Sequence, residues 1–189
     1  VTALEYEWGT KADPADIERA LAADPAVKAV YVQFSETSTG VVNDVRAIGG
    51  IVAKTPAILV VDAISGLGAT DLKTDDWHVD ICVSGSQKAL MVPPGMAYVA
   101  VSEKAWKVVE ACATPRFYFD YPTYRKKMTG DSAQTPYTPA VSLMVAQNAA
   151  IELIRQEGLE NVFERHRWLS KACKAGVRAL GIEPFGPED

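Results

Sequence analysis

Metal-binding and disulfide-forming side chains are scarce in this chain of 189 residues, which has only three cysteines and two histidines. Cys82, Cys112 and Cys173 are odd in number and widely spaced, so neither a disulfide scaffold nor a zinc cluster is expected. His78 and His166 lie far apart, with no thiol or carboxylate cluster at metal-ligand spacing. We therefore predict no metal site and a reducing, cytoplasmic environment.

Long apolar runs and an excess of positive charge are also absent. No stretch approaches the roughly 18 apolar residues of a membrane-spanning helix, and the N-terminal segment has no signal-peptide pattern. The net charge of −5 argues against nucleic acid or an anionic membrane as the main partner. The motifs GxGxxG, GxxxxGKS/T and GxSxG are missing, so nucleotide-binding loops and a serine-hydrolase elbow have no support.

The sequence does contain a regular alternation of strand and helix patterns. Runs rich in Val and Ile, nearly continuous in places, are typical of strands buried in a parallel sheet. We therefore expect an α/β fold with a mostly parallel sheet. The predicted strands cover 28–34, 57–63, 79–86 and 95–102.

Helix signals follow or separate these strands. Asp13 and Pro14 open the first helix, because an acceptable cap precedes a proline in the first turn. Asn43 is predicted to cap a second helix that runs to about Lys54, with apolar residues at helical spacing. A third helix is expected at about 103–113.

The last part of the chain has a different organisation. Residues 114–137 lack periodicity and predict a long irregular connection, a kind of segment that is often functional. Two long helices are expected at about 140–157 and 159–180, with Gly158 and Gly181 as their C-caps.

Three polar residues follow three of the predicted strands. Thr37 comes after the first strand, Asp62 ends the second, and Lys88 lies just past the third. Because ligands bind beyond the carboxyl ends of the strands in open α/β sheets, we expect these residues to meet at one edge. The hydroxyl-rich loop around Thr37 also fits a simple helix entry, since Ser and Thr favour such positions.

Lys88 is a candidate nucleophile. It stands in the turn SGSQK after an apolar strand, where desolvation disfavours the ammonium form and so activates the amine. A lysine that forms a Schiff base needs this property. A solvent-exposed lysine that closes a turn fits the local sequence as well, because most lysines are exposed.

Asp62 is a candidate partner for a cationic ring. A carboxylate at the end of an apolar run is costly unless it is paired, and a protonated pyridine nitrogen would pair with it. A cap or loop hydrogen bond for the following ISGLGA segment is the simpler alternative. The interval from Asp62 to Lys88 suits two strands joined by a crossover. A nucleotide-binding fold would show that interval too, but its phosphate loop is missing.

The segments VVDAISGLGA and VDICVSGSQKALMVPPG resemble the class V aminotransferases of pyridoxal-phosphate (PLP) fold type I. The similarity is greatest to the alanine–glyoxylate and serine–glyoxylate (serine–pyruvate) branch. SETSTGVV and QTPYTPAVSL are similar to that family too, so the resemblance extends from about Tyr31 to Leu180. Cysteine desulfurases usually have a histidine just before the lysine, and Gln87 in that position favours the aminotransferase branch.

The resemblance implies PLP as cofactor and a role for each matching residue. Lys88 would form the Schiff base with the cofactor and then transfer protons. Asp62 would bond the pyridinium nitrogen, and Ile64 would pack against one face of the ring. These roles agree with the chemistry, because the charge of Asp62 keeps the ring protonated and able to accept electrons.

Further roles concern the ring substituents and the phosphate. By the same resemblance, Thr37 would hydrogen-bond the ring substituents and Gln87 would bind the phosphate. Thr138, together with Thr135, would reach the phosphate of the neighbouring subunit in a homodimer.

The resemblance also implies a domain organisation. We expect a three-layer α/β sandwich with a mostly parallel sheet flanked by helices, the large-domain core of fold type I, truncated at both ends. Residues 1–139 would be part of the PLP-binding large domain, 140–180 the helices leading out of it, and 181–189 the start of a missing C-terminal small domain. Such a fragment is expected to bind PLP weakly and to catalyse poorly on its own, because positioning needs the complete site.

Three functional readings follow from these residues. The first is an aminotransferase that moves an amino group between alanine, serine or a similar amino acid and a 2-oxo acid such as glyoxylate or pyruvate. The second is a lyase or desulfurase with the same fold and PLP. The lack of a cysteine on a recognisable mobile loop argues against a desulfurase. The third is a catalytically inactive subunit. The presence of both Lys88 and Asp62 argues against this third possibility.

Overall fold

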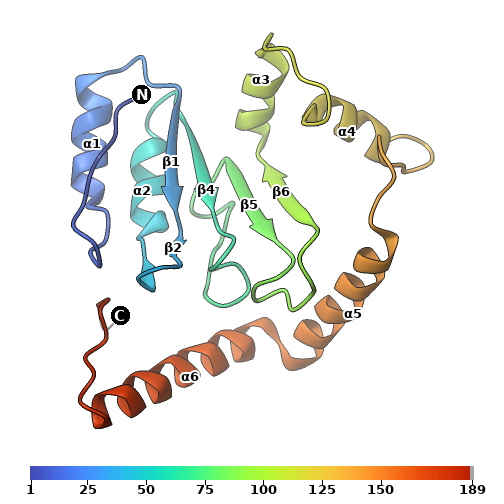
Figure 1. Cartoon of the computed structure of the whole chain (residues 1–189). Helices are drawn as coiled ribbons and strands as arrows, with labels where there is room; N and C mark the ends of the chain where they lie inside the picture. The colour runs from blue at the N-terminus through green and yellow to red at the C-terminus, as the bar shows by residue number, and fades with distance from the viewer. Residues whose placement is uncertain (188–189) are drawn as a thin grey trace.

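Four short apolar segments form the central sheet of the protein, seen in a computed structural model that describes residues 1–187 (Figure 1). The strand order is β1-β4-β5-β6, and the first three strands are parallel whereas β6 is an antiparallel edge strand. The mostly parallel sheet predicted from the apolar runs is therefore confirmed. The strands are β1 (Ala29–Gln33), β4 (Ile58–Asp62), β5 (Ile81–Gly85) and β6 (Ala97–Val101).

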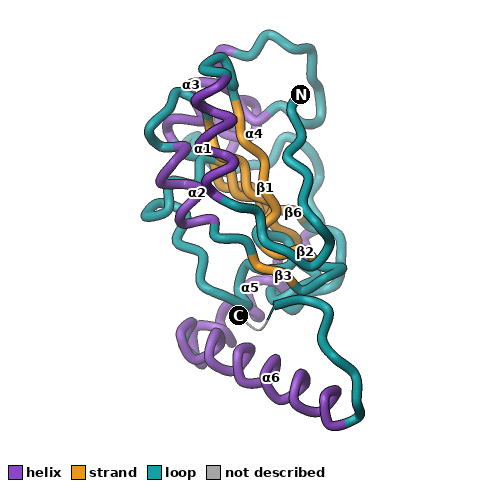
Figure 2. The backbone as a smooth tube through the Cα atoms, turned by 90° about the vertical axis from the view of Figure 1, so that its left-hand side faces the viewer, coloured by secondary structure: helices purple, strands orange, loops and turns teal. Residues whose placement is uncertain are grey.

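One face of the sheet is closed by α1 (Pro14–Ala23) and α2 (Val45–Val52). Figure 2, which views the sheet edge-on, has both helices on the same side. Apolar side chains of both helices are buried against the strands, and this burial is the main force that holds the helices to the sheet. The shared core consists chiefly of Ile17, Leu21, Val45, Ile48, Val52, Leu59, Val61, Ala63 and Cys82.

The opposite face of the sheet is packed much less tightly. Val60, Asp62 and Val83 are only half-buried there, and the side chain of Tyr31 is 77% exposed. The alternation follows from the period of two in a strand, which sends neighbouring side chains to opposite faces. Asp62 therefore stands on the open face, next to the core residues Val61 and Ala63 of the closed one.

The start of α2 differs from the prediction by one residue. Asp44 is the N-cap, and its carboxylate accepts a hydrogen bond of 2.9 Å from the backbone N–H of Ala47. Asn43 instead accepts from the N–H of Ala12 and donates to the carbonyl of Gln33, each at 2.8 Å. Either residue type can cap a helix, and the long-range contacts of Asn43 decide between them.

The prediction of an irregular connection at 114–137 is wrong in part, because this segment contains the helix α4 (Tyr121–Met128). Asp120 caps this helix, accepting from the N–H of Thr123, and Pro122 lies in its first turn. This is the same cap-and-proline signal that marks α1. α4 follows α3 (Glu103–Ala111) and has no buried residue, so the apolar periodicity that reveals a helix is missing.

The chain ends in two long helices, α5 (Val141–Glu157) and α6 (Leu159–Ala179), much as predicted. Gly158 separates them with a φ of 87°, which glycine adopts without strain. Both helices run past the end of the sheet toward which β4 and β5 point (Figures 1 and 2). No helix in the described part of the chain is long and apolar enough to cross a membrane.

Two adjacent glycines in α2 offer a test of this packing. A Cβ at Gly49 would overlap the carbonyl oxygen of Trp77, whereas a Cβ at Gly50 would meet nothing within 4 Å. We expect Gly49→Ala to lower the free energy of unfolding by about 1–3 kcal/mol, the usual cost of overpacking. The control Gly50→Ala should raise it by about 0.4–1 kcal/mol, because alanine loses less backbone entropy in a helix. Urea unfolding of the two variants measures both, and equal effects would contradict the close approach of α2 to residue 77.

Candidate active site

The carboxyl ends of the parallel strands lie side by side. Gln33 at the end of β1 pairs with Asp62 at the end of β4, and Asp62 in turn pairs with Val83 near the end of β5. The loops that leave these ends start from one edge of the sheet (Figure 1). In α/β proteins this edge is where ligands bind. Thr37, Asp62 and Lys88 all belong to it.

The loop after β4 connects the other two loops. The hydroxyl oxygens of Ser65 and Thr37 are in hydrogen-bond contact, which ties this loop to the small hairpin of β2 (Ser35–Glu36) and β3 (Val41–Val42). Gly68, with a φ of 86°, approaches the turn that contains Lys88, where an added Cβ would lie 3.4 Å from the Cβ of Ala89. The sequence marked Thr37 but gave no sign of Ser65 as its partner, because the contact is made across 28 residues.

Asp62 has one oxygen engaged locally and one without a partner. Its Oδ1 accepts a hydrogen bond of 2.9 Å from the backbone N–H of Ile64, the local bond that the sequence allowed as the simpler alternative. No cation pairs with this carboxylate within residues 1–187. Burial raises the pKa of the Cys82 thiol, and the nearby Asp62 carboxylate raises it further. Asp62 is thus half-buried, and its second oxygen can accept a hydrogen bond from another donor.

Lys88 stands in a tight turn just beyond β5. The N–H of Met91 donates to the carbonyl of Lys88 at 2.9 Å and closes the turn 88–91. The lysine side chain is exposed, so the desolvation expected from its place after a buried strand does not occur here. Within this turn, α5 bonds the carbonyl of Leu90 through Gln147. Among the described residues the Lys88 amine has no hydrogen-bond or ion-pair partner.

Ser86 closes the base of this loop. It is fully buried, its backbone N–H donates to the carbonyl of Met96 at 3.1 Å, and its Oγ donates to the carbonyl of Pro93 at 2.7 Å. The same Oγ accepts from the N–H of Met96 at 3.3 Å, and the N–H of Val92 donates to the carbonyl of Ser86. One short side chain therefore joins both arms of the loop that carries Lys88.

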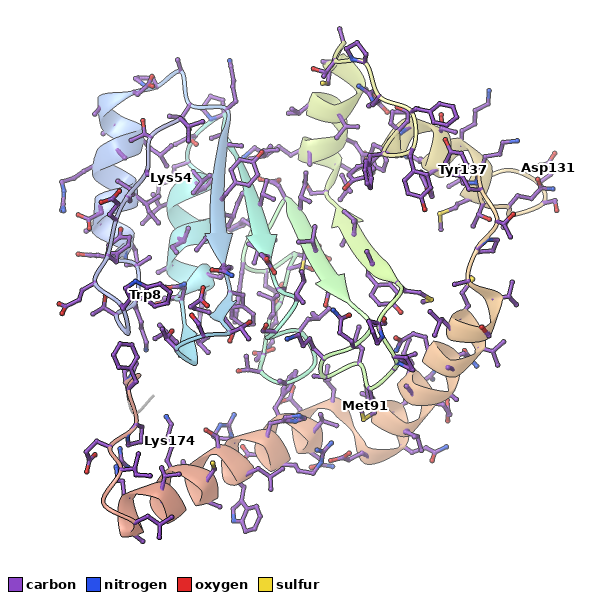
Figure 3. The ribbon with its side chains drawn as sticks, viewed as in Figure 1. Trp8, Lys54, Met91, Asp131, Tyr137 and Lys174 are labelled. Atoms are coloured by element: carbon purple, nitrogen blue, oxygen red, sulfur yellow. The ribbon has the colours of Figure 1, made fainter. Side chains whose placement is uncertain are left out.

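Two features that bear on the same loop were missed by the sequence-based prediction. Met91 has a φ of 62°, a conformation that costs a residue with a side chain about 1–2 kcal/mol. Gln147 on α5 is 5% exposed and donates from Nε2 to the carbonyl of Leu90 at 3.3 Å. A signal for Gln147 existed, since it is a single amide in the apolar stripe of Leu143 and Ala150 at helical spacing. In Figure 3 Met91 lies beside α5.

Ile64 and Gln87 flank the two charged residues. Ile64 is half-buried in the loop after Asp62, and Gln87 is exposed next to Lys88. The amide of Gln87 folds back toward Gly85, where an added Cβ would come within 2.8 Å of its Oε1. Both side chains thus lie at the same sheet edge as the lysine.

Thr135 and Thr138 lie elsewhere, between α4 and α5. Both are exposed, and Thr135 donates its hydroxyl to the carbonyl of Tyr137 at 2.8 Å. They line an open hollow together with Met128 and Met144, and no residue of the sheet edge takes part in it. Figure 3 has Tyr137 well apart from Met91. Within one chain these threonines are therefore not brought together with Lys88.

The fold and the polar residues at its sheet edge now define a class of protein. The chain has the α/β fold of PLP-dependent aminotransferases, and it superposes on a solved pyridoxamine–pyruvate aminotransferase from Mesorhizobium loti with a TM-score of 0.92 and 33% identity. That match covers 98% of this chain and 48% of the other. The family model for class-V aminotransferases matches residues 1–187. The protein belongs to the class-V aminotransferase family.

Curated relatives support the same assignment. An uncharacterized aminotransferase of Methanocaldococcus jannaschii is 45% identical, over 98% of this chain and 48% of its own length. The L-aspartate–glyoxylate aminotransferase of Paracoccus denitrificans is 43% identical and the serine–glyoxylate aminotransferase of Methylorubrum extorquens 39%, each over 97% of this chain and 47% of its own length. The chain thus spans about half the length of the curated relatives it matches.

Two serines in β5 and its loop allow a matched test of the lysine loop. Ser86 makes two hydrogen bonds through its buried Oγ, whereas the buried Oγ of Ser84 has no partner among the described residues. Ser86→Ala should lower the free energy of unfolding by about 1–3 kcal/mol, because it leaves buried backbone groups unsatisfied. Ser84→Ala should be neutral or stabilising for the opposite reason. Thermal unfolding compares them, and a larger loss for Ser84→Ala would show that the bonds of Ser86 do not hold the loop.

Proposed function

We propose that this chain is the cofactor-binding core of a PLP-dependent aminotransferase that exchanges an amino group between a small amino acid and a small 2-oxo acid. The observation that carries the proposal is that Asp62 at the end of β4 and Lys88 in the turn beyond the neighbouring strand β5 lie at one sheet edge, and that among residues 1–187 neither the lysine amine nor one carboxylate oxygen has a partner. The family match and the similarity to enzymes named for glyoxylate and pyruvate support it.

The residues at the sheet edge fit PLP by their chemistry. Lys88 offers a primary amine, Asp62 a charged acceptor for the ring nitrogen, and Ile64 an apolar surface for the ring. Thr37 and Gln87 offer a hydroxyl and an amide for the polar substituents and the phosphate. When bound, PLP supplies an aldehyde that joins to amines and a ring that accepts the electron pair released at the substrate carbon.

Lys88 would serve the reaction in two ways. Its Nζ would hold the cofactor covalently, and the same amine, when free, would take the proton from the substrate Cα and return it to the acceptor carbon. Asp62 keeps the proton on the ring nitrogen, because a nearby negative charge favours the protonated form of a base. The unpaired oxygen of Asp62 is free to accept that proton's hydrogen bond.

The choice of amino donor is an extension of this proposal. Relatives named for serine and for L-aspartate are similar to this chain to nearly the same degree, at 39% and 43% identity. Both act with glyoxylate by their names, so the acceptor is better supported than the donor. We propose alanine or serine as the donor. The exposure of Lys88 supports a substrate cover supplied from outside residues 1–187, because transamination needs a site that excludes water.

We propose that residues 1–139 belong to the PLP-binding large domain and that 140–180 form helices leading out of it. The predicted small-domain segment 181–189 lies partly outside the described residues. The three cysteines are free, which supports a cytoplasmic location. A desulfurase receives no support, since the cysteine nearest Asp62 is the buried Cys82.

A homodimer is part of the proposal. Thr135 and Thr138 are exposed and remote from Lys88 within one chain, and they lie beside a large apolar surface. Phe117 and Tyr118 contact the ring of Tyr137, and they are 80% and 54% exposed. Exposed apolar surface of this kind is typical of a protein interface. Docking of a second copy over it would bring these threonines to the phosphate site of the partner.

Covalent attachment of the cofactor tests the role of Lys88. Incubation of the intact protein with PLP, followed by borohydride reduction and peptide mass spectrometry, should locate the added mass on Lys88. Lys88→Ala should lose both the attachment and a visible absorbance band that borohydride removes. The control Lys54→Ala should keep them, because this exposed lysine precedes β4 at the other end of the sheet. Attachment to another lysine, or none at all, would refute the proposal.

Asp62→Asn extends the same experiment to catalysis. The variant should keep the covalent attachment, since the amine of Lys88 is unchanged, but its kcat should fall about 10²–10³-fold, the usual loss when one electrostatic partner is removed. Coupled assays of transamination with glyoxylate as acceptor measure this. A variant with unchanged kcat would remove Asp62 from the proposed site.

Mixing two inactive variants tests the shared site. Lys88→Ala and Thr138→Val chains should each have little activity as homodimers. After mixing and exchange, activity should return to about a quarter of the wild-type value, because half of the random two-fold dimers are hybrids with one intact site. No recovery, despite hybrid dimers detected by mass spectrometry, would mean that the threonine and the lysine do not serve one site from two subunits.

A further inference from the structure

Gln147 is a buried polar side chain with partners at both ends. Its Oε1 accepts a hydrogen bond of 2.7 Å from the hydroxyl of Tyr98 on β6, and its Nε2 donates to the carbonyl of Leu90 at 3.3 Å. The residue is 5% exposed. A buried amide is stable only where its polar atoms are paired. The two bonds therefore hold α5, the edge strand and the lysine loop together.

The chemistry of the partners fixes the orientation of this amide. The carbonyl of Leu90 can only accept a hydrogen bond, so the Nε2 of Gln147 must face it. The Oε1 then faces Tyr98, whose hydroxyl must donate. Burial raises the pKa of Tyr98, which keeps this hydroxyl protonated and able to donate. A reversed amide would set a donor against Tyr98 and two acceptors against each other at Leu90.

The carbonyl that Gln147 holds belongs to the turn 88–91. This turn is closed by the bond from Met91 to the carbonyl of Lys88, and Met91 has the unfavourable φ of 62°. A strained backbone persists only where its surroundings hold it. Gly68 approaches the turn from the loop after β4, and Gln147 bonds it from α5. These contacts leave the turn little freedom to relax.

We propose that Gln147 is a positioning residue that sets the direction of the Lys88 amine by holding the 88–91 turn against α5. The inference rests on the proposed function, because it concerns the residue that would carry the cofactor. It adds a residue that touches neither cofactor nor substrate. The bond from Gln147 to Leu90 lies two residues from Lys88, so its loss would relax Met91 and turn the lysine away from its working position.

The size of the effect follows from the geometry that the reaction needs. The amine of Lys88 must reach both the cofactor and the proton on the substrate carbon. A displacement of about 1 Å at a reacting group can cost 10²-fold in rate. The hydrogen bond from Tyr98 anchors Gln147 to strand β6 of the sheet. Supporting hydrogen bonds of this kind hold a functional group in its working position.

The experiment uses the intact, PLP-loaded protein with three variants. Gln147→Leu removes both bonds, and Gln147→Glu keeps the acceptor for Tyr98 but loses the donor to Leu90 at neutral pH. Gln156→Leu is the control, an exposed glutamine of the same helix bonded to Glu152. We measure kcat per PLP-loaded site, KM, and the pH midpoint of the absorbance band of the lysine-bound cofactor.

Positioning predicts a distinct pattern. Gln147→Leu should lower kcat about 10- to 100-fold with KM nearly unchanged, and should shift the pH midpoint of the band. Gln147→Glu should approach wild-type activity as the pH falls, because the protonated carboxyl group regains a donor for the carbonyl of Leu90. The control should match the wild type. If Gln147→Leu does not fold, Tyr98→Phe, which removes only the hydroxyl, should show the same direction of change.

Other outcomes would overturn the inference. Variants at 147 with wild-type kcat and pH midpoint per loaded site, even with lower stability, would give Gln147 a merely structural role. Failure of the proposed function is distinguishable, because it would appear in the wild type as the absence of PLP attachment at Lys88. If the wild type binds PLP and catalyses transamination, and the variants at 147 behave in the same way, only the inference about Gln147 is refuted.

Discussion

The parallel pairing of β1, β4 and β5 is the constraint on which the rest of the structure depends. Because these strands run the same way, their carboxyl ends meet at one edge, and Asp62 pairs there with both Gln33 and Val83. The pairing is stabilised by the core around Leu59 and Val61, which α1 and α2 bury. Every candidate cofactor residue except the two threonines near α5 lies at this edge or in the loops that leave it.

Polar contacts then order the loops that leave this edge. Ser65 ties the loop after β4 to Thr37, Ser86 closes the base of the lysine loop, and Gln147 holds its tip. Hydrogen bonds suit this task because they are directional, whereas apolar burial fixes position only loosely. The unfavourable backbone of Met91 lies between two of these contacts, as expected where a strained turn serves a site.

The parts of the molecule that stay open agree with a site completed from elsewhere. Lys88 is exposed, one face of the sheet is half-buried, and aromatic side chains near Tyr137 stand in solvent. The chain spans about half the length of its curated relatives. A PLP enzyme needs a dry and fully lined pocket, since electrostatic stabilisation weakens in water.

The sequence by itself determined the four strands of the central sheet, their mostly parallel arrangement and the long C-terminal helices, because apolar periodicity and caps are local signals. The candidates Asp62 and Lys88 also followed from the sequence, since each stands at the end of an apolar run. Only the tertiary structure decided that Asp44 rather than Asn43 caps α2, that the lysine is exposed, and that Gln147 supports its turn. These outcomes depend on contacts between residues far apart in the chain, and a local pattern holds no information about which distant group will compete for a hydrogen bond or cover a side chain.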